Sequence, residues 1–376
     1  MRIVSTSYSG TPACNDPYIW LRQISFYTGL LEELATRHEV HSIERISYEG
    51  EIRQNNVQYH FIDLKSERVL FPRRIHRLVK QLEPDIVLVN GFIFPLQIIQ
   101  LRASLGKKPV IIVLHRAEKP FKGVKKYLQR AADSCVQAYF FTSAEFGLDW
   151  KQQGIINDRR KIHEIIPASS SFIVLDGIMA KTQLAITGDP VFLWVGRLDN
   201  NKDPLTVLKA MIAFIQSNPL ARFYMIFQED HLLPEVQEMV QHSQLGHAIK
   251  LVGKLPHNQL QNWYNAADFI ISGSHYEGGG IAVSEAMSCG CIPIVTDIIS
   301  FRKMTAGGEC GFLYEAGNEK DLLQKLMMAV KAVREEERRK VIMQFRQELS
   351  FEAIGRKIDT VINYTICHSS IKEPVI

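Results

Sequence analysis

The sequence has 376 residues, with 44 Lys and Arg against 40 Asp and Glu, so it is long enough for two domains that each bury a core. Its apolar and charged fractions, 46% and 22%, are those of a globular protein. It contains no run of about 18 apolar residues, the length that would predict a membrane span. The N-terminal sequence MRIVSTSYSG has no signal-peptide core, and six cysteines without a CxxC pair indicate reduced thiols rather than zinc ligands. These features predict a cytoplasmic protein.

The charge is distributed unevenly along the chain. Residues 1–170 hold 24 Lys and Arg against 17 Asp and Glu, whereas the remainder holds 20 against 23. A basic half beside an acidic half predicts an acidic partner for the first half.

The first half alternates short apolar segments with amphipathic ones. A helix is predicted at residues 20–34, and strands are predicted at 2–6, 39–43, 57–62, 85–90, 110–114, 139–142 and 161–167. This alternation predicts the α/β class, with an open, mostly parallel sheet whose ligands lie beyond the carboxyl ends of the strands. No GxGxxG follows the first strand, which argues against a dinucleotide-dependent oxidoreductase.

His115 follows the strand predicted at 110–114, at the edge of the sheet where ligands are expected. A polar donor pointing at a ligand suits this position better than a metal ligand does. A buried structural histidine is the alternative.

Residues 107–130 carry eight basic residues and one acidic residue, Glu118. Apolar residues recur at helical spacing among the cations Lys122, Lys125, Lys126 and Arg130. A basic amphipathic helix of this kind predicts contact with an anionic membrane surface or a phosphate-bearing acceptor. The alternative is a solvated helix whose apolar face packs on the sheet. No aromatic platform or nucleic-acid-binding module accompanies the charge, so nucleic acid is not expected as a partner.

The second half begins with a strand at 191–195 and a loop that carries Arg197 and Lys202. Asp203 is a favourable helix N-cap and Pro204 a favourable first helical residue. The two cations therefore lie between a strand and a helix, where they can hold a diphosphate and stabilise its charge as it leaves.

A second loop follows the apolar strand predicted at 269–271 and reads HYEGGGIAVSEAMSCG. Its glycines allow close approach of the backbone to a ligand, and the helix that starts after them offers N–H groups to a phosphate. Glu277 precedes the turn and Glu285 lies on the helix, so both carboxylates can accept hydrogen bonds from hydroxyls. The pattern predicts a ligand with phosphates in the middle and a hydroxylated ring at either side.

These residues resemble the donor site of retaining glycosyltransferases of family four, which belong to the group 1 glycosyltransferases and have the GT-B fold, two Rossmann-like domains facing across a cleft. The resemblance implies that Glu277 contacts the transferred sugar, that Glu285 contacts the ribose of the nucleotide, and that His115 lies near the reacting sugar carbon. It also implies that Arg197 and Lys202 bind the leaving diphosphate. Further donor-binding positions are Ser274, Gly278, Gly279, Gly280 and Ile281, with Lys254 beside the base.

The chain departs from the family pattern in its first half and in one glycine. Gly279 replaces an aromatic residue, Ser9 and Gly10 replace a Gly-Gly pair, and Arg116 replaces the acidic residue after His115. The resemblance therefore says least about which residues contact the acceptor and which sugar is transferred.

The resemblance implies an acceptor domain at 1–170, to which a C-terminal helix at 351–376 crosses back, and a donor domain at 188–350. The expected function is transfer of a hexosyl group, with retention, from a nucleotide-diphosphate sugar to a glycan or lipid-linked acceptor in surface polysaccharide biosynthesis. No cofactor or metal is expected, since no Asp-x-Asp occurs, and the expected location is cytoplasmic with peripheral membrane contact.

Three alternatives remain. A sugar-nucleotide epimerase shares the fold, but no convincing acid/base set is evident for it. A glycogen phosphorylase-like enzyme would need a lysine-bound pyridoxal cofactor and a longer chain. A non-catalytic sugar-nucleotide binding protein fits the departures in the first half. Glycoside hydrolysis is disfavoured because no carboxylate pair flanks a sugar.

Overall fold

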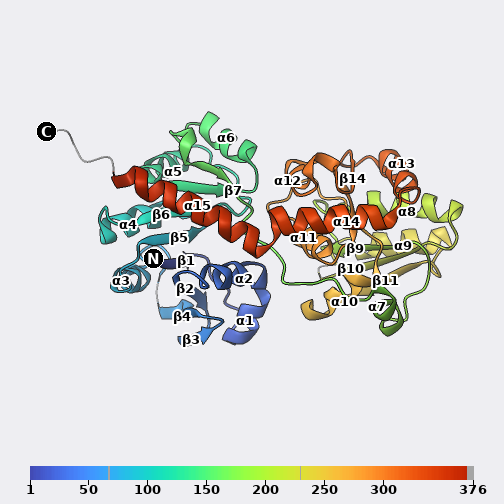
Figure 1. The fold of residues 1–376 in the computed structure, drawn as a ribbon, viewed down its shortest axis with the longest axis horizontal. Coiled ribbons are helices and arrows are strands. Elements are labelled where there is room, and N and C mark those ends of the chain that lie inside the picture. The colour runs from blue at the N-terminus through green and yellow to red at the C-terminus, as the bar shows by residue number, and fades with distance from the viewer. Residues whose placement is uncertain (67, 229, 371–376) are drawn as a thin grey trace. The chain divides into compact units, whose positions relative to one another are not determined.

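The computed structural model describes residues 1–66, 68–228 and 230–370. The chain divides into two compact units, of which the first comprises residues 1–169 together with the segment from Phe351, and the second comprises residues 170–350 (Figure 1). The second unit thus begins earlier than the expected boundary at 188, because residues 170–187 include helix α7 (Gly177–Gln183), which packs against α10 (Leu260–Ala266).

The first unit is built on an eight-stranded sheet of order β3-β4-β2-β1-β5-β6-β7-β8. All its pairings are parallel except that of β3 with β4. The strands are β1 (Arg2–Ser7), β2 (Glu39–Ile46), β3 (Gly50–Gln54), β4 (Val57–Asp63), β5 (Ile86–Asn90), β6 (Val110–Leu114), β7 (Ala138–Phe141) and β8 (Ile162–Glu164).

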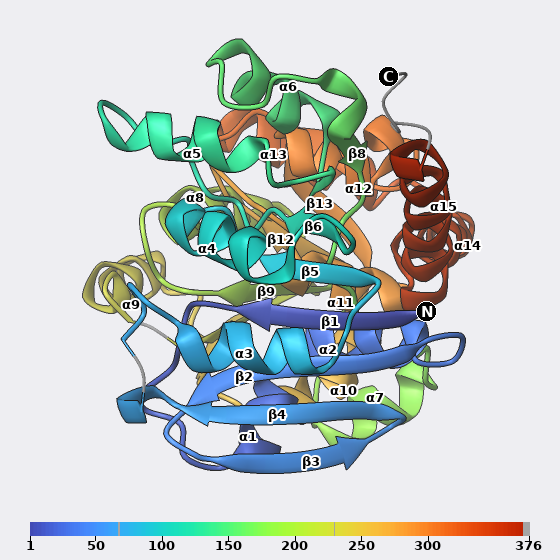
Figure 2. The same cartoon turned by 90° about the vertical axis from the view of Figure 1, so that its left-hand side faces the viewer.

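Helices cover both faces of this sheet, which Figure 2 shows from the side of α3, α4 and α5. One hydrophobic core lies between the sheet and α1, α2 and α15, and the other between the sheet and α3 to α6. The helices are α1 (Pro17–Gln23), α2 (Ser25–Leu34), α3 (Arg73–Gln81), α4 (Pro95–Leu105), α5 (Lys125–Asp133), α6 (Ala144–Gln152) and α15 (Phe351–Ser370). The C-terminal helix α15 packs against α2.

The second unit has a six-stranded parallel sheet of order β11-β10-β9-β12-β13-β14. Its strands are β9 (Val191–Gly196), β10 (Arg222–Phe227), β11 (Ile249–Gly253), β12 (Phe269–Ser272), β13 (Ile292–Thr296) and β14 (Phe312–Tyr314). One core involves α8 (Pro204–Ser217), α9 (Leu233–Ser243) and α13 (Glu319–Ala329); the other involves α7, α10 and α11 (Ile281–Ser288). Helices α12 (Ile299–Met304) and α14 (Arg334–Gln344) complete the unit.

Two local predictions were wrong. The helix expected at 20–34 is two helices, because the chain leaves helical geometry at Ile24 (φ −101°, ψ 22°) so that both pieces bury residues in one core. Strand β3 was not predicted, because its sequence GEIRQ is polar and it pairs only at the edge of the sheet.

Five of the six cysteines are buried and all six are free thiols. In the part of the chain that the structure describes, every helix is too short or too polar to cross a membrane.

Candidate functional site

The glycine-rich loop between β12 and α11 is shaped by Gly280. This residue has φ +52°, in the left-handed region, and a Cβ there would lie 2.9 Å from both Met304 Sδ and Phe301 Cε1. Only glycine fits this backbone without displacing its neighbours. Gly278 and Gly279 are partly exposed, so their backbone can approach a ligand ahead of the α11 N-terminus.

The two loops predicted to form the site meet in the structure. The Lys202 ammonium forms an ion pair with Glu277 Oε1, and the Ser274 hydroxyl donates to the same oxygen at 2.8 Å. Both members of the ion pair are largely buried, with side chains 22% and 14% exposed. Lys202, Glu277, Gly280 and Ile281 line one small cavity of about 20 Å³ beside this pair.

Asp199 joins the two cations of the first loop and was not predicted. One oxygen accepts from the Lys202 backbone N–H at 2.9 Å, and the other lies 3.2 Å from Arg197 Nε. The Arg197 side chain is half exposed. Asp203 caps α8, as predicted, by accepting from the Thr206 N–H at 3.2 Å. The loop therefore holds both cations at the carboxyl end of β9.

Glu285 lies on helix α11 and is almost fully buried. Its Oε1 accepts from His257 Nε2 at 2.5 Å and its Oε2 accepts from the Tyr264 hydroxyl at 3.0 Å. The bond to Glu285 raises the pKa of His257 above its usual value, although burial opposes the shift. Phe172 stacks on the His257 ring with centroids 5.0 Å apart. A carboxylate has about four lone-pair positions, so Glu285 can accept further hydroxyl hydrogens.

His115 lies in the interior of the first unit, 3% exposed, among the rings of Phe141, Phe146 and Trp150. Its Nε2 donates to the Glu118 carbonyl at 2.9 Å, its Nδ1 has no partner, and burial lowers its pKa. These contacts are those of a structural histidine, and a role near the reacting carbon stays a prediction.

The basic helix α5 turns its apolar residues outward. Val124, which precedes the helix, is 83% exposed and Tyr127 is 67% exposed, whereas the helix buries Gln129, Ala132 and Asp133. The alternative in which the apolar face packs on the sheet is therefore wrong. Of the predicted cations, Lys122, Lys125 and Arg130 are exposed and Lys126 is partly buried, and Lys254 of the second unit is also exposed.

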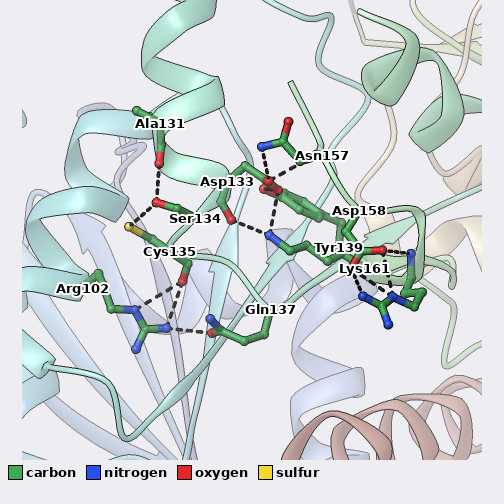
Figure 3. Close-up of polar contacts among 11 residues, drawn as sticks. Arg102, Ala131, Asp133, Ser134, Cys135, Gln137, Tyr139, Asn157, Asp158 and Lys161 are labelled. Carbon is green, nitrogen blue, oxygen red and sulfur yellow. Dashed lines mark hydrogen bonds and ion pairs between the residues drawn. The ribbon is translucent and has the colours of Figure 1, made fainter. Parts of the chain in front are cut away.

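A separate buried polar cluster surrounds Asp133, at the end of α5 (Figure 3). Its carboxylate accepts from Tyr139 at 3.0 Å and from Asn157, and pairs with Lys161 at 3.1 Å. The cluster lies where β7 and β8 begin, at the edge opposite the one where ligands of parallel sheets bind. Its contacts anchor α5 to the sheet rather than form a binding site.

Comparisons with solved structures identify the class of fold. Sucrose-phosphate synthase from Thermosynechococcus elongatus superposes with a TM-score of 0.72 and 17% identity, over 98% of this chain and 99% of that one. HepE from Anabaena, in complex with UDP and glucose, gives a TM-score of 0.72 and 12% identity, over 97% and 100% of the two chains. The predicted GT-B fold is therefore confirmed.

Sequence comparisons show which proteins the second half of the chain resembles. Residues 179–347 match the family model of glycosyl transferases group 1. The GDP-mannose:cellobiosyl-diphosphopolyprenol alpha-mannosyltransferase of Xanthomonas oryzae is 24% identical over 230 residues, 59% of this chain and 58% of that protein. The lipopolysaccharide core biosynthesis mannosyltransferase LpsB of Rhizobium meliloti is 31% identical over 91 residues, a quarter of its own length. Residues 179–347 therefore resemble the group 1 glycosyltransferases, and the matched segments span from a quarter to just over half of these two relatives.

Proposed function

We propose that the chain transfers a hexosyl group from a nucleotide-diphosphate sugar to a glycan or lipid-linked acceptor, with retention of anomeric configuration. The observation that carries the proposal is the meeting of Lys202 with Glu277, beside the glycine-rich start of α11. Cations and an open helix N-terminus suit a diphosphate, and a carboxylate suits sugar hydroxyls. Two relatives are named as mannosyltransferases, one of them using GDP-mannose, which supports a sugar-nucleotide donor.

In the proposed reaction, the bond from the anomeric carbon to the diphosphate oxygen breaks and a bond from the acceptor oxygen forms on the same face. The acceptor proton passes to the leaving diphosphate. Arg197 and Lys202 stabilise the negative charge that develops on that group, which is the largest contribution the site can make. Glu277 orients the sugar, and Glu285 accepts from the ribose. We expect the cations to serve without a bridging metal.

The ion pair also sets the resting state of the site. Lys202 shares one carboxylate oxygen of Glu277 with Ser274, so the carboxylate is already oriented before the donor arrives. A diphosphate that attracts the ammonium would leave the second carboxylate oxygen available to a sugar hydroxyl. Replacing Lys202 removes both the diphosphate contact and the orientation of Glu277.

A transfer assay tests the proposal. Protein incubated with UDP- and GDP-hexoses and a lysate-derived lipid fraction should release nucleoside diphosphate and form an α-linked product from an α-linked donor, as read by NMR. Lys202→Met should slow release about 10²- to 10³-fold, while Lys209→Met, which replaces an exposed lysine of α8 in the same unit, should not. Interconversion of free sugar nucleotides would identify an epimerase instead, and binding without consumption would identify a non-catalytic binder.

We also propose that the α5 face of the first unit contacts an anionic membrane on its cytoplasmic side. Lys125 and Arg130 are exposed there beside Tyr127, and Leu70 and Phe71 are exposed just before α3. Helices α3, α4 and α5 pack in that order, as Figure 2 shows. Apolar side chains flanked by cations are typical of interfacial binding, which salt weakens.

A further inference from the structure

The first unit contains a cavity of about 330 Å³ at the carboxyl ends of its central strands. The segments that follow β1, β5 and β6 line one side, and side chains of α1, α2 and β2 line the other. Its walls are mainly apolar, with Trp20, Phe26 and Tyr27 among them. A largely apolar concavity with a few convergent polar groups, at this edge of a parallel sheet, is typical of a small-molecule site.

Glu44 places a carboxyl group in the wall of this cavity. It is 7% exposed, and within the described chain no cation lies within ion-pair distance of it. Its oxygens accept from Trp20 Nε1 at 3.0 Å and from Ser42 Oγ at 2.7 Å. Burial raises the pKa of this carboxyl. Burying a carboxyl without an ion pair costs folding free energy. The remaining acceptor positions of Glu44 line the cavity, where they can bind hydroxyl groups of a ligand.

Arg116 lies in the same wall without meeting Glu44. Its guanidinium donates to Asn90 Oδ1 at 3.2 Å and to the Pro167 carbonyl at 3.0 Å, and its central carbon lies 4.6 Å over the Tyr27 ring. Tyr27 and Asn90 are themselves hydrogen-bonded at 3.1 Å. The cation is therefore held in a fixed position by neutral groups rather than by a carboxylate.

We propose that this cavity binds a pyranose ring of the acceptor, which rests on the proposed glycosyl transfer. A sugar presents hydroxyls that both donate and accept, so it can donate to Glu44 and accept from Arg116, while its apolar ring face packs on Trp20. A phosphate suits the cavity poorly because two carboxyl side chains, those of Glu44 and Glu118, line it. The cavity therefore binds the sugar of the acceptor, and any phosphate that the acceptor carries binds outside this cavity.

The test uses the full chain with methyl α-mannoside, methyl β-glucoside and cellobiose as probes, titrated by ligand-observed NMR. At least one probe should saturate with a millimolar Kd, and inorganic phosphate should not displace it. Glu44→Gln, which keeps the shape but removes the charge, should raise that Kd about tenfold or more. Trp20→Phe should raise that Kd too, and Lys151→Ala, which replaces an exposed lysine of α6 outside the cavity, should leave it unchanged.

Glycoside binding and nucleotide binding are read out separately. Thermal stabilisation by nucleoside diphosphates reports the second unit alone and verifies that each variant is folded. If nucleotides stabilise the protein but no glycoside binds, or if both Glu44→Gln and Trp20→Phe bind glycosides as the wild type does, the cavity is not a sugar site. If glycosides bind as predicted but no nucleotide does, the cavity assignment stands and glycosyl transfer is contradicted.

Discussion

Replacing Glu285 by Gln should weaken nucleoside diphosphate binding about 10- to 150-fold. The side chain is buried and uses one lone pair of each oxygen, for His257 and Tyr264, which leaves acceptor positions for a ribose hydroxyl. A hydrogen bond to a charged group contributes about 1.5–3 kcal/mol, which corresponds to that range of affinity. Isothermal titration with UDP and GDP measures it directly.

The choice of Gln rather than Ala follows from the structure. Tyr264 is fully buried, so Glu285→Ala would leave its hydroxyl without this partner and cost about 1–3 kcal/mol of stability. Tyr264→Phe is the matched control, since it removes a donor to the carboxylate but leaves the carboxylate itself. It should change affinity less than threefold, on the order of 0.6 kcal/mol or less. Equal affinities of the Gln variant and this control would refute the ribose contact.

Four further outcomes are expected. Gly280→Ala should lower stability by about 1–2 kcal/mol in chemical denaturation, because of the left-handed backbone and the contacts its methyl would meet; a neutral effect would contradict the loop geometry. Asp133→Ala should cost about 3–5 kcal/mol by the same measurement, since it leaves a lysine without its buried partner, and a change below 1 kcal/mol would contradict that anchor. The pKa of His257 is raised, so its contribution to stability is present below about pH 6.5 and is lost as pH rises through the raised value; His257→Ala should flatten that part of the pH–stability profile, and an unchanged profile would contradict the pairing. In a sedimentation assay, Tyr127→Ala should bind phosphatidylserine vesicles more weakly than the wild type, and added salt should weaken binding further, whereas Lys254→Ala should bind as the wild type does. Equal binding by the wild type and both variants would contradict the proposed membrane contact of α5.

Most strands of the two sheets were predictable because runs of Val, Ile, Leu and Phe mark buried parallel strands. The break at Ile24 was not, because no glycine or proline marks it and only packing of the two pieces into one core produces it. The edge strand β3 also lacks an apolar run, since one side of it has no partner strand.

The candidate site divides in the same way. Lys202 and Glu277 could be placed at one site from sequence because each follows a strand and precedes a helix, and such strand ends meet at one edge of a parallel sheet. The ion pair between them was not predicted. Their supporting partners, Asp199 and Tyr264, carry no motif, and their contacts depend on how loops fold back. Glu44 lies just after the strand predicted at 39–43, and nothing in the sequence there indicates a cavity.

A crystal structure of the chain with bound UDP or GDP would locate the donor site directly. We expect the diphosphate to lie within hydrogen-bond distance of Arg197 and Lys202, at the N-terminus of α11, with the ribose hydroxyls on Glu285. A nucleotide bound elsewhere, or bound in this place with its ribose away from Glu285 and its phosphates away from both cations, would contradict it.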